Sequence, residues 1–207
     1  MSSGFKFDRR RQKRNARIFD SLATALGLAA GQMTPKPKSA VSEMADMNIP
    51  VLSALTRYDM MSAVSGMSGE WNGVLVSVWE GAIPKRGRRV RYRAGFEVIG
   101  PQFIIRKGKL AGSFFAGSNE PPRVEVGRRG FARKFALRSD STAGLAQYLT
   151  DSRQRSITDL SKGCSYLELT NYTIDMVGKA PLSGDLAEVT NGLNRLTELA
   201  HIMMVGE

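Results

Sequence analysis

Residues 71–98 read WNGVLVSVWEGAIPKRGRRVRYRAGFEV, and this stretch decides the fold. Valines alternate with other side chains before a turn at Pro84–Gly87. After the turn, Val90, Tyr92 and Ala94 alternate with arginines, so that one side of the segment is apolar and the other basic. A period of two is typical of a half-buried β-strand, and two such runs joined by a short turn predict an antiparallel hairpin.

Several further segments have the composition of strands and lie between glycine, proline and asparagine residues that are typical of turns. These segments are Phe103–Lys109, Arg123–Val126, Phe131–Arg138, Tyr166–Thr170 and Tyr172–Val177. Because their connections are short, we expect one antiparallel sheet of about six or seven strands.

Two helices are predicted in the C-terminal half of the chain. Residues 139–142 are all of types that cap helix N-termini, and a helix is expected from there to Lys162. A last helix opens at Ser183 or Asp185 and carries an apolar stripe that continues to Met203. The stripe fits packing on the sheet, and it also fits a partner helix in an oligomer. The predicted fold class is α+β, an antiparallel sheet covered by two helices.

The N-terminal third is predicted to extend from that domain. Residues 8–30 place apolar side chains on one helical face, and the residues that follow are rich in proline, which disfavours helix. One short helix is expected around residues 50–61. The predicted units are a mobile basic amphipathic arm over 1–31, a methionine-rich linker over 32–65 and the α+β domain over 66–207.

Positive charge is concentrated in two blocks of the sequence. The net charge is +11, and it divides into +5 over residues 1–20, −2 over 21–84, +12 over 85–138 and −4 over 139–207. A polarised distribution of this kind attracts polyanions such as the phosphates of lipid or nucleic acid. An ordinary solvated basic face would have the same composition.

The chain is poor in the side chains that most active sites use. It contains one histidine, His201, and one cysteine, Cys164, so neither a His/Cys zinc site nor a Ser-His-Asp or Cys-His arrangement is expected. The glycine-rich stretches lack the spacing that cradles phosphates. We therefore expect no enzyme activity, no catalytic residue, no metal and no cofactor.

The candidate anion-binding residues are the basic side chains of the arm and of the predicted hairpin. In the hairpin, Arg89, Arg91 and Arg93 point to one side of a strand about 6.5–7 Å apart, a spacing close to that of neighbouring phosphates. The full set is Arg9, Arg10, Arg11, Lys13, Arg14, Arg17, Arg86, Arg88, Arg89, Arg91, Arg93, Arg106, Lys107 and Lys109. Charge on an exposed strand also protects a sheet against aggregation, and that interpretation fits the arginine row equally well.

The arm has two interpretations. Its arginines are followed by Ile18, Phe19, Leu22 and Leu26, which we expect to contact the acyl boundary of a membrane while the basic end meets anionic headgroups. The alternative is nucleic acid, because arginine-rich helices neutralise phosphates without a sequence code. The arm has no base-stacking aromatic residue among its arginines, which favours the membrane.

The sequence contains three short motifs, Gly69–Val78, Gly100–Ile105 and Phe131–Asp140, the last leading to Tyr148–Thr150. Together they resemble a group of bacterial proteins in which membrane-embedded helices precede a small α+β domain, and the resemblance covers about residues 66–205. The resemblance implies a soluble domain that works at a membrane face, with no established activity. In place of transmembrane helices, this chain has the arginine-led segment 22–30, which is too short to span a bilayer.

The sequence therefore favours a non-enzymatic adaptor or scaffold subunit that binds anionic lipid, or an acidic protein partner, at a membrane surface. The runner-up is a nucleic-acid-binding protein that uses the same basic residues. With a single cysteine and no recognisable secretory signal, the expected location is cytoplasmic and peripheral to the inner face of a membrane.

Overall fold

The computed structural model describes residues 3–33, 64–83, 87–107 and 121–205. The helices are α1 (Ser3–Leu26), α4 (Arg129–Ala132), α5 (Thr142–Tyr148), α6 (Asp151–Lys162) and α7 (Leu186–Met204). The strands are β1 (Ala29–Met33), β2 (Val64–Trp71), β3 (Val74–Ile83), β4 (Gly87–Gly95), β5 (Phe103–Lys107), β6 (Ala136–Ser139), β7 (Cys164–Thr170) and β8 (Thr173–Gly178).

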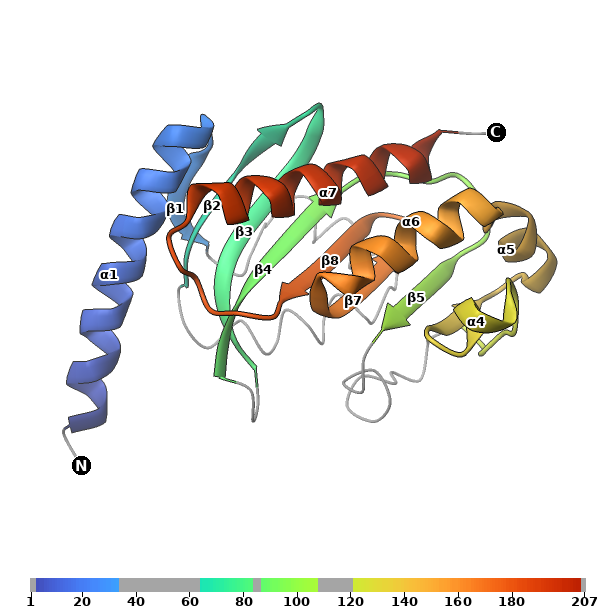
Figure 1. Ribbon diagram of the computed structural model, residues 1–207, viewed down its shortest axis with the longest axis horizontal. Coiled ribbons are helices and arrows are strands. Elements are labelled where there is room, and N and C mark those ends of the chain that lie inside the picture. Colours follow the sequence, from blue (N-terminus) through green and yellow to red (C-terminus); the bar gives the residue numbers. More distant parts are fainter. Residues whose placement is uncertain (1–2, 34–63, 84–86, 108–120, 206–207) are drawn as a thin grey trace.

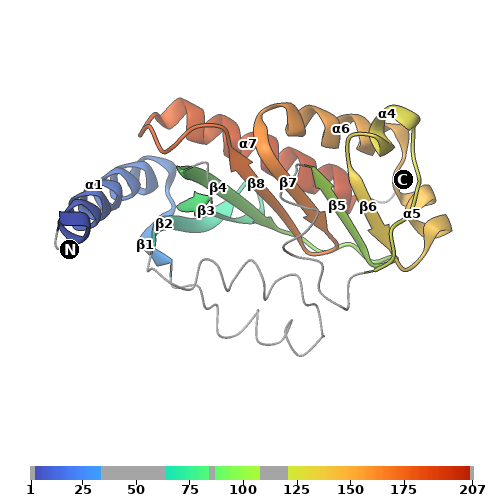
Figure 2. The ribbon, with the colours of Figure 1, turned by 90° about the horizontal axis from the view of Figure 1, so that it is seen from below.

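The strands form one eight-stranded sheet in the order β1-β2-β3-β4-β8-β7-β5-β6, and every pairing between these strands is antiparallel. Helices α6 and α7 cover one face of the sheet, and α1 lies at one end of the molecule beside β1 and β2 (Figures 1 and 2). The predicted α+β class is thus confirmed, with slightly more strands than expected.

The hairpin of residues 71–98 forms as predicted, with β3 and β4 paired from Leu75↔Gly95 to Ile83↔Gly87. Val90, Tyr92 and Ala94 are buried on the side that faces the helices. Gly192 of α7 lies directly over the Tyr92 ring, where a Cβ would come within 2.7 Å of Cε1. This glycine therefore lets α7 approach the sheet closely.

Several predicted element boundaries need correction. The expected strand Phe131–Arg138 begins as helix α4 and becomes β6 only at Ala136. The expected strand Arg123–Val126 contributes one isolated bridge, between Arg123 and Arg138. The expected single helix up to Lys162 is two helices, because the backbone leaves helical geometry at Leu149 and Thr150 then caps α6.

The first two strands were not expected. Helix α1 ends at Leu26, Gly27 adopts a φ of +67°, and the chain continues directly into β1, which pairs with β2. Both strands are rich in glycine, alanine, serine and methionine, which give no clear alternation. The predicted short helix around residues 50–61 lies outside the described residues.

The C-terminal half of α1 belongs to the main hydrophobic core. Phe19 is 1% exposed and Leu22 is 4% exposed, and both lie in the same cluster as the side chains beneath α7. The expected mobile arm is therefore packed against the sheet over this half of the helix.

Candidate functional site

The arginine row of β4 lies on the face of the sheet away from α7, since the residues that alternate with it belong to the core and one of them, Tyr92, lies against Gly192 of α7. Arg89, Arg91 and Arg93 are each half-buried. The guanidinium carbon of Arg93 lies 5.5 Å from the centre of the Trp79 ring, on the neighbouring strand β3. The predicted alignment of the row is therefore present, and its chemistry depends on what each guanidinium contacts.

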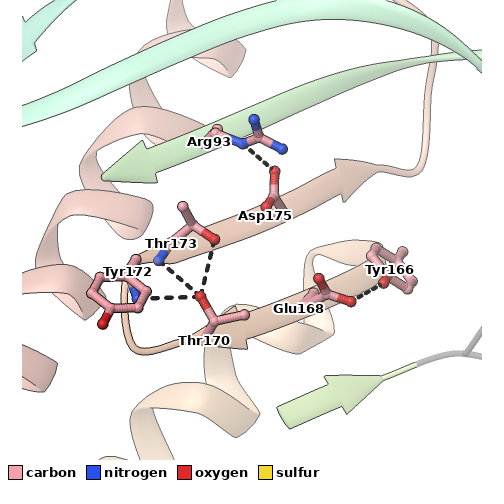
Figure 3. A network of polar contacts seen from close by, with 7 residues as sticks. All are labelled: Arg93, Tyr166, Glu168, Thr170, Tyr172, Thr173 and Asp175. Atoms are coloured by element: carbon pink, nitrogen blue, oxygen red, sulfur yellow. Dashed lines mark hydrogen bonds and ion pairs between the residues drawn. The ribbon is translucent and has the colours of Figure 1, made fainter. Parts of the chain in front are cut away.

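Arg93 forms an ion pair within the sheet. Its Nε donates to Oδ1 of Asp175, directly opposite on β8, over 2.7 Å (Figure 3). This contact neutralises an arginine of the predicted anion-binding row.

Arg106 is buried, so the prediction that it binds anions at the surface is wrong. Its Nε lies 2.5 Å from Oε2 of Glu168 on β7, and both side chains are 3% exposed. The hydroxyl of Tyr166 donates to the same carboxylate oxygen over 2.6 Å (Figure 3). Arg106 therefore neutralises an internal carboxylate and does not present its charge to a surface ligand.

Burial shifts the pKa values of Glu168 and Tyr166. Desolvation raises the pKa of Glu168, and the positive charge of Arg106 opposes that rise. Burial also raises the pKa of Tyr166, as does the carboxylate beside it. This environment favours the neutral phenol of Tyr166 and works against the charged form of Glu168.

The two ion pairs belong to one charged row that crosses four strands. Strand register places Arg93 opposite Asp175, Asp175 opposite Glu168, and Glu168 opposite Arg106. We call these four residues the charged row. Its signs run positive, negative, negative, positive, so the row is neutral as a whole and offers no net positive charge to an anion.

Glu80 organises a second polar cluster, where α1 meets the sheet. This carboxylate is 1% exposed, accepts from Nδ2 of Asn15 over 2.6 Å and accepts from the backbone N–H of Leu182 over 3.2 Å. Arg11 lies 3.6 Å and Arg88 lies 3.9 Å from its oxygens. Two predicted anion-binding arginines therefore flank an internal acid, which joins α1 to β3, β4 and the segment before α7.

The other predicted anion-binding residues of α1 divide into two groups. Lys13, Arg14 and Arg17 are exposed. Arg9 and Arg10 lie in the same helix, and their side chains are outside what the structure describes.

The predicted membrane-contacting residues lie on the inner side of α1. Phe19 and Leu22 are buried in the core, and Ile18 and Leu26 are partly buried and packed against it. This is a correction: the apolar stripe is covered by the protein itself, because the sheet and α7 offer it the apolar surroundings that the sequence suggested a bilayer would supply.

Lys107 has an internal role as well. Its Nζ donates to the carbonyl of Ser161, at the C-terminal end of α6, and lies 3.4 Å from the carbonyl oxygen of Cys164. A cation at this position complements the helix dipole. Arg86 and Lys109, the remaining predicted anion-binding residues, lie outside the described residues.

Sequence reasoning missed the carboxylates Glu80, Glu168 and Asp175, which take up much of the predicted positive charge. A signal was present for Glu80, which continues the inward-pointing series of Val76 and Val78. Glu168 alternates with the core residues Leu167 and Leu169, so it points to the other face of the sheet and gives no such signal. A carboxylate at a core-facing strand position requires a cationic or hydrogen-bonding partner.

Within the described residues, the structure contains no cluster of three or more potential metal-ligating His, Cys, Asp or Glu side chains. In the same part of the chain, no helix combines the length and apolar character needed to cross a bilayer. The imidazole of His201 is exposed and its Nε2 lies 2.8 Å from the carbonyl oxygen of Asn72.

Comparison with protein-family models and with curated proteins finds no match. Among solved structures, the fold is similar to the crystal structure of the mycobacterial trehalose monomycolate transport factor A, TtfA, with a TM-score of 0.54. The two chains are 9% identical, and the match covers 93% of this chain and 97% of that chain. At this identity the likeness defines a shared fold.

Proposed function

We propose that the protein is a non-enzymatic accessory factor that binds an anionic membrane surface through the outer side of α1. The observation that carries this proposal is the exposure of Lys13, Arg14 and Arg17 on a helix whose apolar side is occupied by the protein's own core. Helix α1, which carries these three cations, lies at one end of the molecule (Figure 1). Their side chains have the chemistry to contact phosphate-bearing headgroups.

The contact is electrostatic rather than insertive, because the apolar stripe of α1 is buried. Each basic residue near an anionic bilayer contributes about 1 kcal/mol, so three provide about 3 kcal/mol. Such binding is peripheral and weakens as salt shortens the Debye length, which is about 10 Å at 0.1 M ionic strength.

The structural neighbour supports an accessory role. TtfA is a transport factor, and the two chains share a fold over nearly their whole lengths. We accordingly propose that this chain assists a transport process at the inner face of a membrane as an adaptor or scaffold. An acidic protein partner at the same surface would be recognised by the same three cations.

Vesicle co-sedimentation tests the proposal. The purified chain should bind vesicles of phosphatidylglycerol and phosphatidylcholine, fail to bind phosphatidylcholine alone, and release as salt is raised. The triple variant Lys13→Gln, Arg14→Gln, Arg17→Gln should bind about 100-fold more weakly, since each lost contact is worth roughly a factor of five.

A matched control removes the same charge elsewhere. Arg123, Arg129 and Arg155 are exposed residues toward the α4 and α6 end of the molecule, and their replacement by glutamine should weaken binding by less than about five-fold. Point variants are preferred because deletion of residues 1–31 would remove part of the core. Failure of the wild-type chain to bind anionic vesicles at low salt would overturn the proposal.

A further inference from the structure

Several exposed charged side chains lie at the two ends of the strands. Across one end of the strands, the last residues of β3, β5 and β8 lie beside the first residues of β4, β6 and β7. We call six of the basic residues near these strand ends the basic edge: Arg88, Arg89, Lys107, Lys134, Lys162 and Lys179. The opposite edge carries the exposed carboxylates Glu70, Glu97 and Asp140.

Strand pairing brings the members of the basic edge together although they are far apart in the sequence. The register pairs Cys164, which follows α6, with Gly178, which precedes Lys179. On one side of this pair the backbone N–H of Val90 donates to the carbonyl of Ala180 over 3.3 Å. On the other side Lys107 reaches the end of α6. The basic edge is therefore continuous from β4 to β5.

The end of α6 is the centre of this positive region. Arg195 of α7 donates to the carbonyl of Asp159 over 2.7 Å, beside the exposed Lys162, which lies 2.6 Å from the Asp159 carboxylate. The hydrogen bond and charge of Lys162 lower the pKa of Asp159, and the charges of Arg195 and Lys134 lower it further. One carboxylate thus lies among three cations, so the local field stays positive.

We propose that the basic edge is a second membrane-contacting surface, and that the protein sits on an anionic phospholipid bilayer with the basic ends of its strands toward the lipid. The exposed side chains of Lys134, Lys162 and Lys179 make the contact. This inference rests on the proposed function and adds to it the orientation of the molecule.

Helix α1 and the basic edge adjoin one another. Arg11 of α1 and Arg88 at the start of β4 lie beside the same carboxylate, Glu80. The N-terminal half of α1 extends past the edge at which β4 begins and β5 ends, toward the bottom of Figure 1. Both surfaces can therefore face one bilayer, while Glu70, Glu97 and Asp140 at the other edge are kept away from its negative charge.

The test is a second triple variant, Lys134→Gln, Lys162→Gln, Lys179→Gln, in the full chain. We expect its affinity for the same anionic vesicles to fall by about 100-fold, because each basic contact is worth roughly a factor of five. The double variant Arg123→Gln, Arg155→Gln is the control here, because Arg129 in α4 lies just before β6 begins, and it should bind within about five-fold of wild type. Circular dichroism spectra should be unchanged, since all five positions are exposed.

The outcomes separate the two proposals. If the wild-type chain binds vesicles and the α1 variant does not, while the lysine variant binds like wild type, the orientation is overturned and the proposed function stands. If the wild-type chain does not bind vesicles, both are overturned. Binding of duplex DNA in place of vesicles, with the same loss in the lysine variant, would assign the basic edge to nucleic acid and overturn the membrane orientation.

Discussion

Replacing Arg106 by methionine should destabilise the protein strongly. The substitution leaves the 3%-exposed carboxylate of Glu168 without the cation whose Nε lies 2.5 Å away. Breaking a buried pair in this way costs about 3–5 kcal/mol in the free energy of unfolding. That is a large part of the roughly 5–15 kcal/mol that stabilises a typical domain.

The loss should depend on pH in a defined direction. Burial raises the pKa of Glu168 and Arg106 restrains the rise, so the Arg106→Met variant has a still higher pKa. A carboxyl whose pKa is higher in the folded than in the unfolded chain binds its proton more tightly when folded. Its stability is fully present below the unfolded value of about 4.3 and is lost as the pH rises through the folded value. The deficit of the variant should therefore be largest at neutral pH and smaller near pH 5.

Urea unfolding followed by circular dichroism at the two pH values measures this effect. The double variant Arg106→Met, Glu168→Gln keeps an acceptor for the Tyr166 hydroxyl and should recover more than half of the loss. Arg89→Met, at a half-buried position of β4, is the matched control. A loss below about 1 kcal/mol for Arg106→Met, or a loss that is the same at both pH values, would refute the assignment of a buried charge pair.

Two further substitutions test the packing. Gly192→Ala should lower the free energy of unfolding by about 1–3 kcal/mol, because the new methyl would lie 2.7 Å from Cε1 of Tyr92. This loss should outweigh the higher helix propensity of alanine. A raised midpoint in thermal or urea unfolding would contradict this contact. Leu22→Ala should lower the free energy of unfolding by about 2–5 kcal/mol in the absence of lipid, because Leu22 is only 4% exposed. Leu75→Ala, at a position 69% exposed, is the control and should have little effect. Equal effects would mean that α1 does not pack against the sheet.

Elements with strong local patterns were predictable from the sequence. The β3–β4 hairpin has strict alternation about a turn, and α7 has a long apolar stripe, so each pattern identifies both the element and its buried side. Strands β1 and β2 could not be found this way. Their glycines, serines and alanines gain strand geometry from pairing with neighbours that the local sequence does not specify.

The candidate site was harder to predict than the fold. The arginines were identified, but their partners depend on register: Arg93 meets Asp175, and Arg106 meets Glu168, across 82 and 62 residues of sequence. The number of arginines and lysines in a segment therefore overestimates the positive charge that is available to a ligand. The apolar side of α1 was recognised correctly, and only the tertiary structure decides that it meets protein instead of lipid.

The order of the strands has a consequence for how the chain assembles. Strands β1 to β4 occupy one half of the sheet and β5 to β8 the other, and the ladder of β4 with β8 is the joint between them. During synthesis, β1 to β4 would be complete before β8 is made, so β4 would be an unpaired edge strand. Such a strand can pair with other chains. The arginines of β4 would keep nascent chains apart by repulsion until β8 emerges and Asp175 takes its place opposite Arg93.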